Sequence, residues 1–324
     1  MKTRIFANTG RLVSEIGLGC WQLGADWGHV SDDDALRILE TAVDHGVTFI
    51  DTADVYGAGR SETLIGQFIK QRQEELFIAT KIGRQNYPGP NTPEIVRQHI
   101  NDCRWRLGVD ALDLVQLHCI PPDVMASGEV FDALLAFKQE GLIKNFGASV
   151  ESMDEALMIL DQPGLTSLQI IFNIFRQKPI STLFDKAIAS NVGIIVRLPL
   201  ASGLLAGKFT SETTFGEDDH RNYNKDGAAF NVGETFAGLP LSKGVEFVER
   251  IKELVPEGIT MAQFSQRWIL DHDAVSTVIT GASKPSQVAD NASASELPPL
   301  SKEIHSHLAA INESSIKEHI RGLY

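Results

Sequence analysis

Four ionisable residues lie at or just beyond the ends of three apolar runs. Asp51 ends the run that begins at Val47, Tyr56 follows it closely, Lys81 follows the run 76–80, and His118 follows the run 112–117. A phenol with a pKa of about 10 donates its proton poorly near neutral pH, but a nearby ammonium favours the phenolate and lowers that pKa. Lys81 can supply the ammonium, Asp51 can orient it, and His118 can hydrogen-bond to the same substrate oxygen. These types suit carbonyl reduction, with a cofactor's hydride and a proton from Tyr56.

Such chemistry needs a scaffold that brings the ends of separate runs together. After an amino-terminal segment compatible with a hairpin, short apolar runs alternate with amphipathic helical stretches nearly to the end of the chain. Strands are expected at 15–19, 47–51, 76–80, 112–117, 143–148, 168–172, 193–197 and 275–279. Strongly apolar strands that alternate with helices predict a parallel sheet covered by helices. The leading prediction is an α/β fold, a closed (β/α)₈ TIM barrel forming a single domain over residues 1–324, because its strand ends meet at one mouth.

Two of the intervening helices carry clear boundary signals. Ser31 can cap a helix that Gly46 can end, and Pro93 can open another, after Thr92, that runs to Gly108. The faces predicted to be buried are Ala35, Leu39, Ala42 and Val43 in the first helix, and Ile95, His99, Ile100, Cys103 and Leu107 in the second.

An open doubly wound sheet is the alternative fold. It would show a glycine-rich phosphate turn after the first strand, and the segment 17–24 fits that pattern poorly, because no long helix follows and Trp21 stands where the backbone must approach a phosphate. The polar stretch from about Thr210 to Phe236 breaks the regular alternation. With regular structure on both sides, it is predicted to be a functional loop over the barrel mouth.

Composition limits the partners of this protein. The net charge of −13 argues against nucleic acid or an anionic membrane as the main partner, because both require a basic face. Three cysteines without metal-type spacing indicate reduced thiols. With no signal peptide and no spanning run, we expect a cytoplasmic protein. No metal is expected: the acidic cluster 217–219 is interpreted as a solvated loop, with a metal site as the alternative.

The four residues and the sequence around them resemble one enzyme family over essentially the full length. The segment 49–57, Phe-Ile-Asp-Thr-Ala-Asp-Val-Tyr-Gly, is similar to the first signature of the aldo-keto reductases, and the Asp-Tyr-Lys-His tetrad of that family matches Asp51, Tyr56, Lys81 and His118. The resemblance implies catalysis by this tetrad. It also implies NADPH as cofactor, with NADH possible, bound without a Rossmann domain.

Two later segments resemble the cofactor loops of the same family. The segment 198–208 resembles the strap over the pyrophosphate, and 281–291 resembles the segment that holds the adenosine end. A helix that starts after Gly281 can also offer N–H groups to a phosphate. The resemblance, with the charges of these loops, implies a cofactor site made of Trp21, Asp51, Ser149, Gln169, Arg197, Pro199, Leu200, Ser202, Lys208, Arg221, Gly281, Ser283, Lys284, Gln287, Asp290 and Asn291. For Trp21, a place in the core is an equally good interpretation.

Three positions depart from the family pattern. Val150 stands where the family usually has Asn, which puts one carboxamide contact in doubt, and Thr280 replaces a common Pro, a change expected to matter little. Arg197 stands where an aromatic residue usually stacks on the nicotinamide. A guanidinium can also stack, or can pair with a carboxylate, so Arg197 hints at a polar or acidic substrate.

Two functions of different classes stay open. The first is an NADPH-dependent oxidoreductase that acts on an aldehyde, ketone or sugar, or on the corresponding alcohol. The second is a nicotinamide-binding regulatory subunit of the channel-associated kind. The intact tetrad favours the enzyme, and no docking tail supports the regulatory role. Lyase or isomerase chemistry without nicotinamide would leave both cofactor-like loops unexplained.

Overall fold

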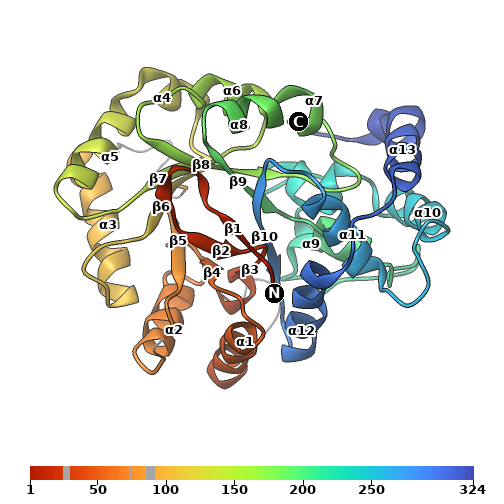
Figure 1. Cartoon of the computed structure of the whole chain (residues 1–324), viewed down its shortest axis with the longest axis horizontal. Helices are drawn as coiled ribbons and strands as arrows, with labels where there is room; N and C mark the ends of the chain where they lie inside the picture. Colours follow the sequence, from red (N-terminus) through yellow and green to blue (C-terminus); the bar gives the residue numbers. More distant parts are fainter. Residues whose placement is uncertain (25–29, 73, 85–91) are drawn as a thin grey trace.

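The computed structural model describes residues 1–24, 30–72, 74–84 and 92–324. Within them, eight parallel strands form a closed barrel in the order β10-β3-β4-β5-β6-β7-β8-β9 (Figure 1). These strands are β3 (Ile16–Gly19), β4 (Phe49–Asp51), β5 (Phe77–Ile82), β6 (Leu114–His118), β7 (Phe146–Ser149), β8 (Leu165–Ile171), β9 (Gly193–Arg197) and β10 (Val275–Gly281). All eight predicted strands are present, and the predicted (β/α)₈ fold is confirmed.

An amino-terminal hairpin closes the end of the barrel where the strands begin. Strands β1 (Thr3–Ile5) and β2 (Leu12–Ser14) pair antiparallel and lie across the barrel strands in Figure 1. Between them, Phe6 packs on Phe49 and Phe77, with ring centroids 5.5 and 5.1 Å away. This apolar plug leaves the opposite end of the barrel, where the strands end, for the site.

Helices cover the outside of the barrel (Figure 1). The longer ones are α1 (Asp32–Asp44), α2 (Arg60–Ile69), α3 (Pro93–Leu107), α5 (Glu129–Gln139), α10 (Leu241–Lys252), α11 (Met261–Leu270), α12 (Pro285–Ser293) and α13 (Lys302–Ile311). The shorter ones are α4 (Pro122–Ser127), α6 (Met153–Ile159), α7 (Pro179–Thr182), α8 (Phe184–Ala189) and α9 (His220–Tyr223). No helix in the described part of the chain has the length and apolar character needed to cross a membrane.

The helix boundary signals were largely predictive. Ser31 caps α1, with its hydroxyl accepting a hydrogen bond from the Asp34 N–H at 3.1 Å. The predicted face of α1 is buried, together with Ile38. In α3 the prediction is partly wrong, because Val96 is buried while Ile95 and His99 are half-buried.

The strand register aligns the polar strand ends. Lys81 pairs with Gln116 across β5 and β6, while His118, Ser149 and Gln169 form a continuous row across β6, β7 and β8. Neighbours in register lie close together around the rim. The tetrad side chains are thereby directed to one mouth.

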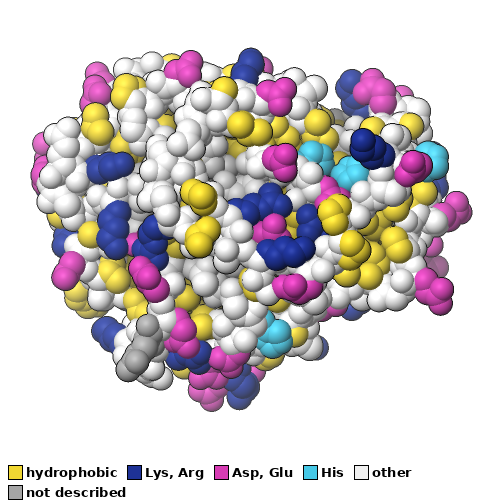
Figure 2. Space-filling model, viewed as in Figure 1, with side chains coloured by type: hydrophobic (Ala, Val, Ile, Leu, Met, Phe, Trp, Pro, Cys, Tyr) yellow, Lys and Arg dark blue, Asp and Glu magenta, His cyan; other side chains and the backbone are white. Residues whose placement is uncertain are grey.

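The segment 210–236 breaks the alternation, as expected, but it is not without structure. It contains α9 and the 3₁₀ turn Val232–Glu234, and a second 3₁₀ turn, Phe236–Gly238, begins at its last residue. Three of its residues, Arg221, Phe230 and Glu234, line the cavity at the barrel mouth. Acidic and basic side chains intermingle on the opposite, hairpin-covered face (Figure 2).

Candidate active site

Lys81 is the centre of the predicted tetrad. Its ammonium donates to Asp51 Oδ1 in a short contact, to the Thr52 carbonyl at 2.9 Å and to the Tyr56 hydroxyl at 3.3 Å. Lys81 and Asp51 are almost completely buried. A buried ion pair persists only when additional hydrogen bonds satisfy both partners, and all three ammonium hydrogens have an acceptor here.

The second oxygen of the Asp51 carboxylate is also satisfied. Oδ2 accepts from the amide of Gln169 at 2.8 Å and from that of Gln116 at 3.2 Å. These amides come from β8 and β6, and Lys81 comes from β5, so side chains of three strands fix the orientation of one carboxylate. Asp51 can therefore hold Lys81 in place beside Tyr56.

The environment of the pair sets the protonation of Lys81 and Tyr56. Burial lowers the pKa of Lys81, but Asp51 and Tyr56 together more than offset it, and the net direction is upward. The pKa of Tyr56 is also raised, because burial disfavours the phenolate by more than Lys81 favours it. The expected lowering by Lys81 is thus present but smaller than the effect of burial, and Tyr56 retains its proton at neutral pH.

His118 is neutral and has a defined tautomer. Burial, followed by the charges of Arg84, Lys81 and Arg197, places its pKa well below the ordinary value. Arg84 Nη1 lies 3.4 Å from His118 Nε2, and a guanidinium can only donate, so Nε2 accepts and the proton is on Nδ1. Nδ1 has no hydrogen-bond partner among the described residues. With this tautomer, His118 can donate a hydrogen bond to a substrate oxygen only from Nδ1. Donation from Nε2 would require the other tautomer.

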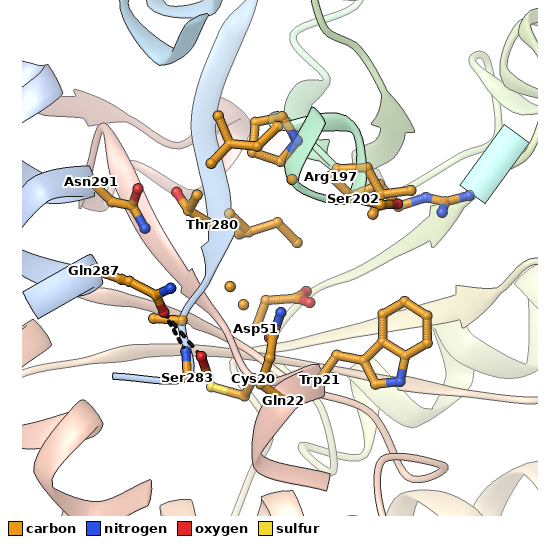
Figure 3. A pocket seen from close by; sticks show the side chains of 18 of the residues that line it. Cys20, Trp21, Gln22, Asp51, Arg197, Ser202, Thr280, Ser283, Gln287 and Asn291 are labelled. Carbon is orange, nitrogen blue, oxygen red and sulfur yellow. Dashed lines mark hydrogen bonds between the residues drawn. The ribbon is translucent and has the colours of Figure 1, made fainter. Parts of the chain in front are cut away.

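A cavity of about 390 Å³ lies at the barrel mouth. Ser283, Gln287 and Asn291 are grouped on one side of it, Trp21 and Arg197 on the other, and Asp51 between them (Figure 3). Of the tetrad, Asp51, Tyr56 and His118 line the cavity, while Lys81 is buried next to them. Trp21 lines the mouth, with its ring stacked 6.0 Å from that of Tyr56.

Most residues predicted for the cofactor line this same cavity. They are Trp21, Asp51, Gln169, Arg197, Pro199, Leu200, Ser202, Lys208, Arg221, Gly281, Ser283, Gln287, Asp290 and Asn291. The two others, Ser149 and Lys284, are not among the described lining residues. Ser149 is buried, with its hydroxyl 3.6 Å from the Cys119 sulfur, and Lys284 is the N-cap residue of α12.

The side of the cavity predicted to hold the adenosine end is built by the turn before α12. The Ser283 N–H and hydroxyl both donate to Gln287 Oε1, at 2.8 and 3.2 Å (Figure 3). A Cβ on Gly281 would lie 2.1 Å from the Gln22 amide nitrogen, so a side chain at this position would have to displace the end of the Gln22 side chain. Arg221 is held by Asp219, whose carboxylate accepts from Arg221 Nε and Nη2. One member of the acidic cluster 217–219 is thus an ion-pair partner, although a solvated loop was predicted.

The three departures from the family pattern occupy defined places. Val150 is buried and its carbonyl accepts from Arg197 Nη2 at 3.3 Å. Thr280 lines the cavity and donates to Gln266 Oε1 at 3.0 Å. Arg197 Nη1 lies 3.3 Å from Glu234 Oε1.

The sequence predictions missed two charged residues at the mouth, Arg84 and Glu234. Arg84 follows β5 and lies 3.3 to 3.4 Å from the Glu234 carboxylate. Phe230, also missed, lies under the Arg84 guanidinium at 5.3 Å. The sequence could have indicated Arg84 by its position, because it lies three residues after Lys81 and just beyond the end of a strand.

The family model described as "Aldo/keto reductase family" matches residues 15–313. The aldo-keto reductase YhdN of Bacillus subtilis is 28% identical over 89% of this chain and 87% of its own length. A probable voltage-gated potassium channel subunit beta of Arabidopsis thaliana is 29% identical over 93% of each chain. The structure of the glycerol dehydrogenase AKR11B4 of Gluconobacter oxydans superimposes with a TM-score of 0.78, at 26% identity over 98% of this chain and 95% of that one.

Proposed function

The chain belongs to the aldo/keto reductase family, and on that premise we propose that it reduces an aldehyde, ketone or sugar carbonyl with NADPH, with Tyr56 as the general acid. It is an oxidoreductase of a class that depends on NAD(P)H. The reverse reaction, oxidation of an alcohol with Tyr56 as base, uses the same groups. The observation that carries the proposal is the Tyr56 hydroxyl, 3.3 Å from the Lys81 ammonium, in a residue that lines the cavity.

The proposed roles follow from the hydrogen bonds of the tetrad. As the substrate oxygen gains negative charge, Tyr56 gives it a proton, and the Lys81 ammonium stabilises the phenolate that forms. Asp51 keeps Lys81 charged and in place during this transfer. When bound, the nicotinamide cofactor supplies the hydride.

The residues of the cavity suit a nicotinamide dinucleotide. The cavity extends from the tetrad to the turn before α12, within the size range of ligand sites. Lys208 and Arg221 offer positive charge, and the indole of Trp21 offers a flat apolar surface. These residues would hold the cofactor, with Arg197 and Gln169 near its reactive end.

A regulatory role related to the channel subunits is the second candidate, since a relative with that name is as similar as YhdN. The two relatives are about equally similar to this chain, so the similarity alone favours neither the reductase nor the regulatory role. The complete tetrad in an open cavity favours turnover, because a subunit that only binds cofactor does not require a proton donor beside a buried ammonium.

The test is a panel of aldehydes, ketones and sugars, followed by NADPH consumption and run in parallel with NADH. We expect turnover of at least one carbonyl class. Tight binding of NADPH without turnover across the whole panel would contradict the enzyme and favour the regulatory role.

A further inference from the structure

Two arginines share one buried carboxylate at the cavity mouth. Glu234, which is 3% exposed, lies 3.3 Å from Arg84 Nη1 and 3.3 Å from Arg197 Nη1. All three residues line the cavity. Because the Arg84 and Arg197 pKa values are raised and that of Glu234 is lowered, the three groups carry one net positive charge.

The contacts within this cluster leave donor capacity unused. Guanidinium–carboxylate hydrogen bonds are typically about 2.7–2.9 Å long, whereas the described arginine contacts to the Glu234 carboxylate measure 3.3 to 3.4 Å. A second carboxylate, that of Glu151, has an oxygen within 4.8 Å of one of Glu234. Glu151 is not among the described lining residues, and burial followed by the Glu234 charge raises its pKa, which weakens its competition for the arginines.

Arg84 is the more available of the two cations. Its side chain is 25% exposed, against 11% for Arg197. Arg197 is further engaged by the Val150 carbonyl and lies 3.7 Å from the Cys119 sulfur. Arg84 instead lies over the Phe230 ring and beside His118 Nε2.

Arg84 is also close to the proposed reacting centre. The rings of His118 and Tyr56 have centroids 6.0 Å apart in an edge-to-face arrangement, and Arg84 Nη1 is 3.4 Å from the His118 ring. A carbonyl oxygen that accepts from Tyr56 would therefore have the Arg84 guanidinium on its His118 side. A negative group close to the reacting carbon of the substrate would meet this cation.

From this arrangement we infer that the substrate is a carbonyl compound that also carries a carboxylate, and that Arg84 is the residue that binds that carboxylate. The inference rests on the proposed reductase function and names the substrate class of the same site. The substrate carboxylate would accept hydrogen bonds from Arg84 N–H groups whose contacts with the Glu234 carboxylate are long.

The test compares two aldehydes that differ in charge: benzaldehyde with a carboxylate in the meta position, and the methyl ester of that acid. Kinetics are measured with NADPH for the wild type and for Arg84→Met, which keeps length and removes charge. We expect the variant to lose at least roughly tenfold more in kcat/KM for the acid than for the ester, because the contact of Arg84 with His118 affects both aldehydes alike. The control Arg97→Met alters an exposed arginine on α3 that pairs with Glu140, and should change neither value.

Two further measurements do not depend on the stability of that variant. Benzoate should inhibit the wild type competitively against the ester, and Glu234→Gln, which removes the competing charge, should lower KM for the acid relative to the ester. Equal losses for acid and ester in Arg84→Met, or no inhibition by benzoate, would overturn the inference. If the wild type reduces neither aldehyde nor any member of the carbonyl panel, the proposed function itself fails.

Discussion

The Lys81 ammonium lies 3.3 Å from the Tyr56 hydroxyl, with its other contacts on the Asp51 carboxylate and the Thr52 carbonyl. This relationship links folding to chemistry. The buried ion pair of Asp51 and Lys81 links β4 to β5. It also places a positive charge where the phenolate of Tyr56 would form.

Tyr56→Phe should abolish carbonyl reduction, because the change deletes the proton donor and keeps the ring that stacks on Trp21. Cofactor affinity, measured by fluorescence titration, should be nearly unchanged. Tyr223→Phe is a matched control, since Tyr223 is 42% exposed and is not among the described lining residues. Full steady-state turnover by Tyr56→Phe would show that another group is the acid.

The pH dependence of reduction follows from the same environment. The pKa of Tyr56 is raised above its ordinary value of 10, so the protonated donor persists through neutral pH and is lost only on the alkaline side. The pKa of His118 is lowered well below 6.5, so His118 stays neutral across the same range. We expect a flat kcat profile from about pH 6.5 to pH 10, followed by a fall. A fall centred near neutral pH would contradict this assignment.

Removing one member of the buried pair should destabilise the barrel. Lys81→Met leaves the Asp51 carboxylate buried with only two amide donors, at a cost of about 3–5 kcal/mol in the free energy of unfolding. The double variant Asp51→Asn with Lys81→Met removes both charges and should recover much of that loss. Urea denaturation measures both values. An additive double variant would show that the two charges do not interact.

Lys208, Arg221 and Lys284 predict tighter binding of NADPH than of NADH. Lys208 and Arg221 line the cavity, while Arg221 already pairs with Asp219. We therefore expect the larger effect from Lys208→Met, with a loss of about 1.5–3 kcal/mol for NADPH and little for NADH. Fluorescence titration with both cofactors measures this. Equal affinities in the wild type would remove the basis for the assignment.

The sequence predicted the barrel, and with it the proximity of Asp51, Tyr56, Lys81 and His118, because the strands follow local rules. Apolar runs of strand length mark each strand, and the parallel barrel topology brings their ends together. The Arg84–Glu234 pair was not predictable in this way, because its members are 150 residues apart and Glu234 lies in a loop without periodicity. The shift from Ile95 to Val96 in α3 has a similar origin, since the packing of a helix on its neighbours fixes its rotation within the range that its apolar pattern allows.

Arg197 provides the last prediction. Its guanidinium contacts Glu234 and the Val150 carbonyl, both at 3.3 Å, on the rim of β9 next to the proposed nicotinamide site. We expect Arg197→Met to weaken cofactor binding for every substrate, because a stacking contact with the cofactor is needed whatever carbonyl is reduced. The ratio of kcat/KM for acid over ester should stay constant, in contrast to Arg84→Met. A selective rise of KM for the acid alone would instead make Arg197 the carboxylate-binding residue. Unchanged cofactor affinity and unchanged kinetics with both aldehydes would leave Arg197 a structural role alone.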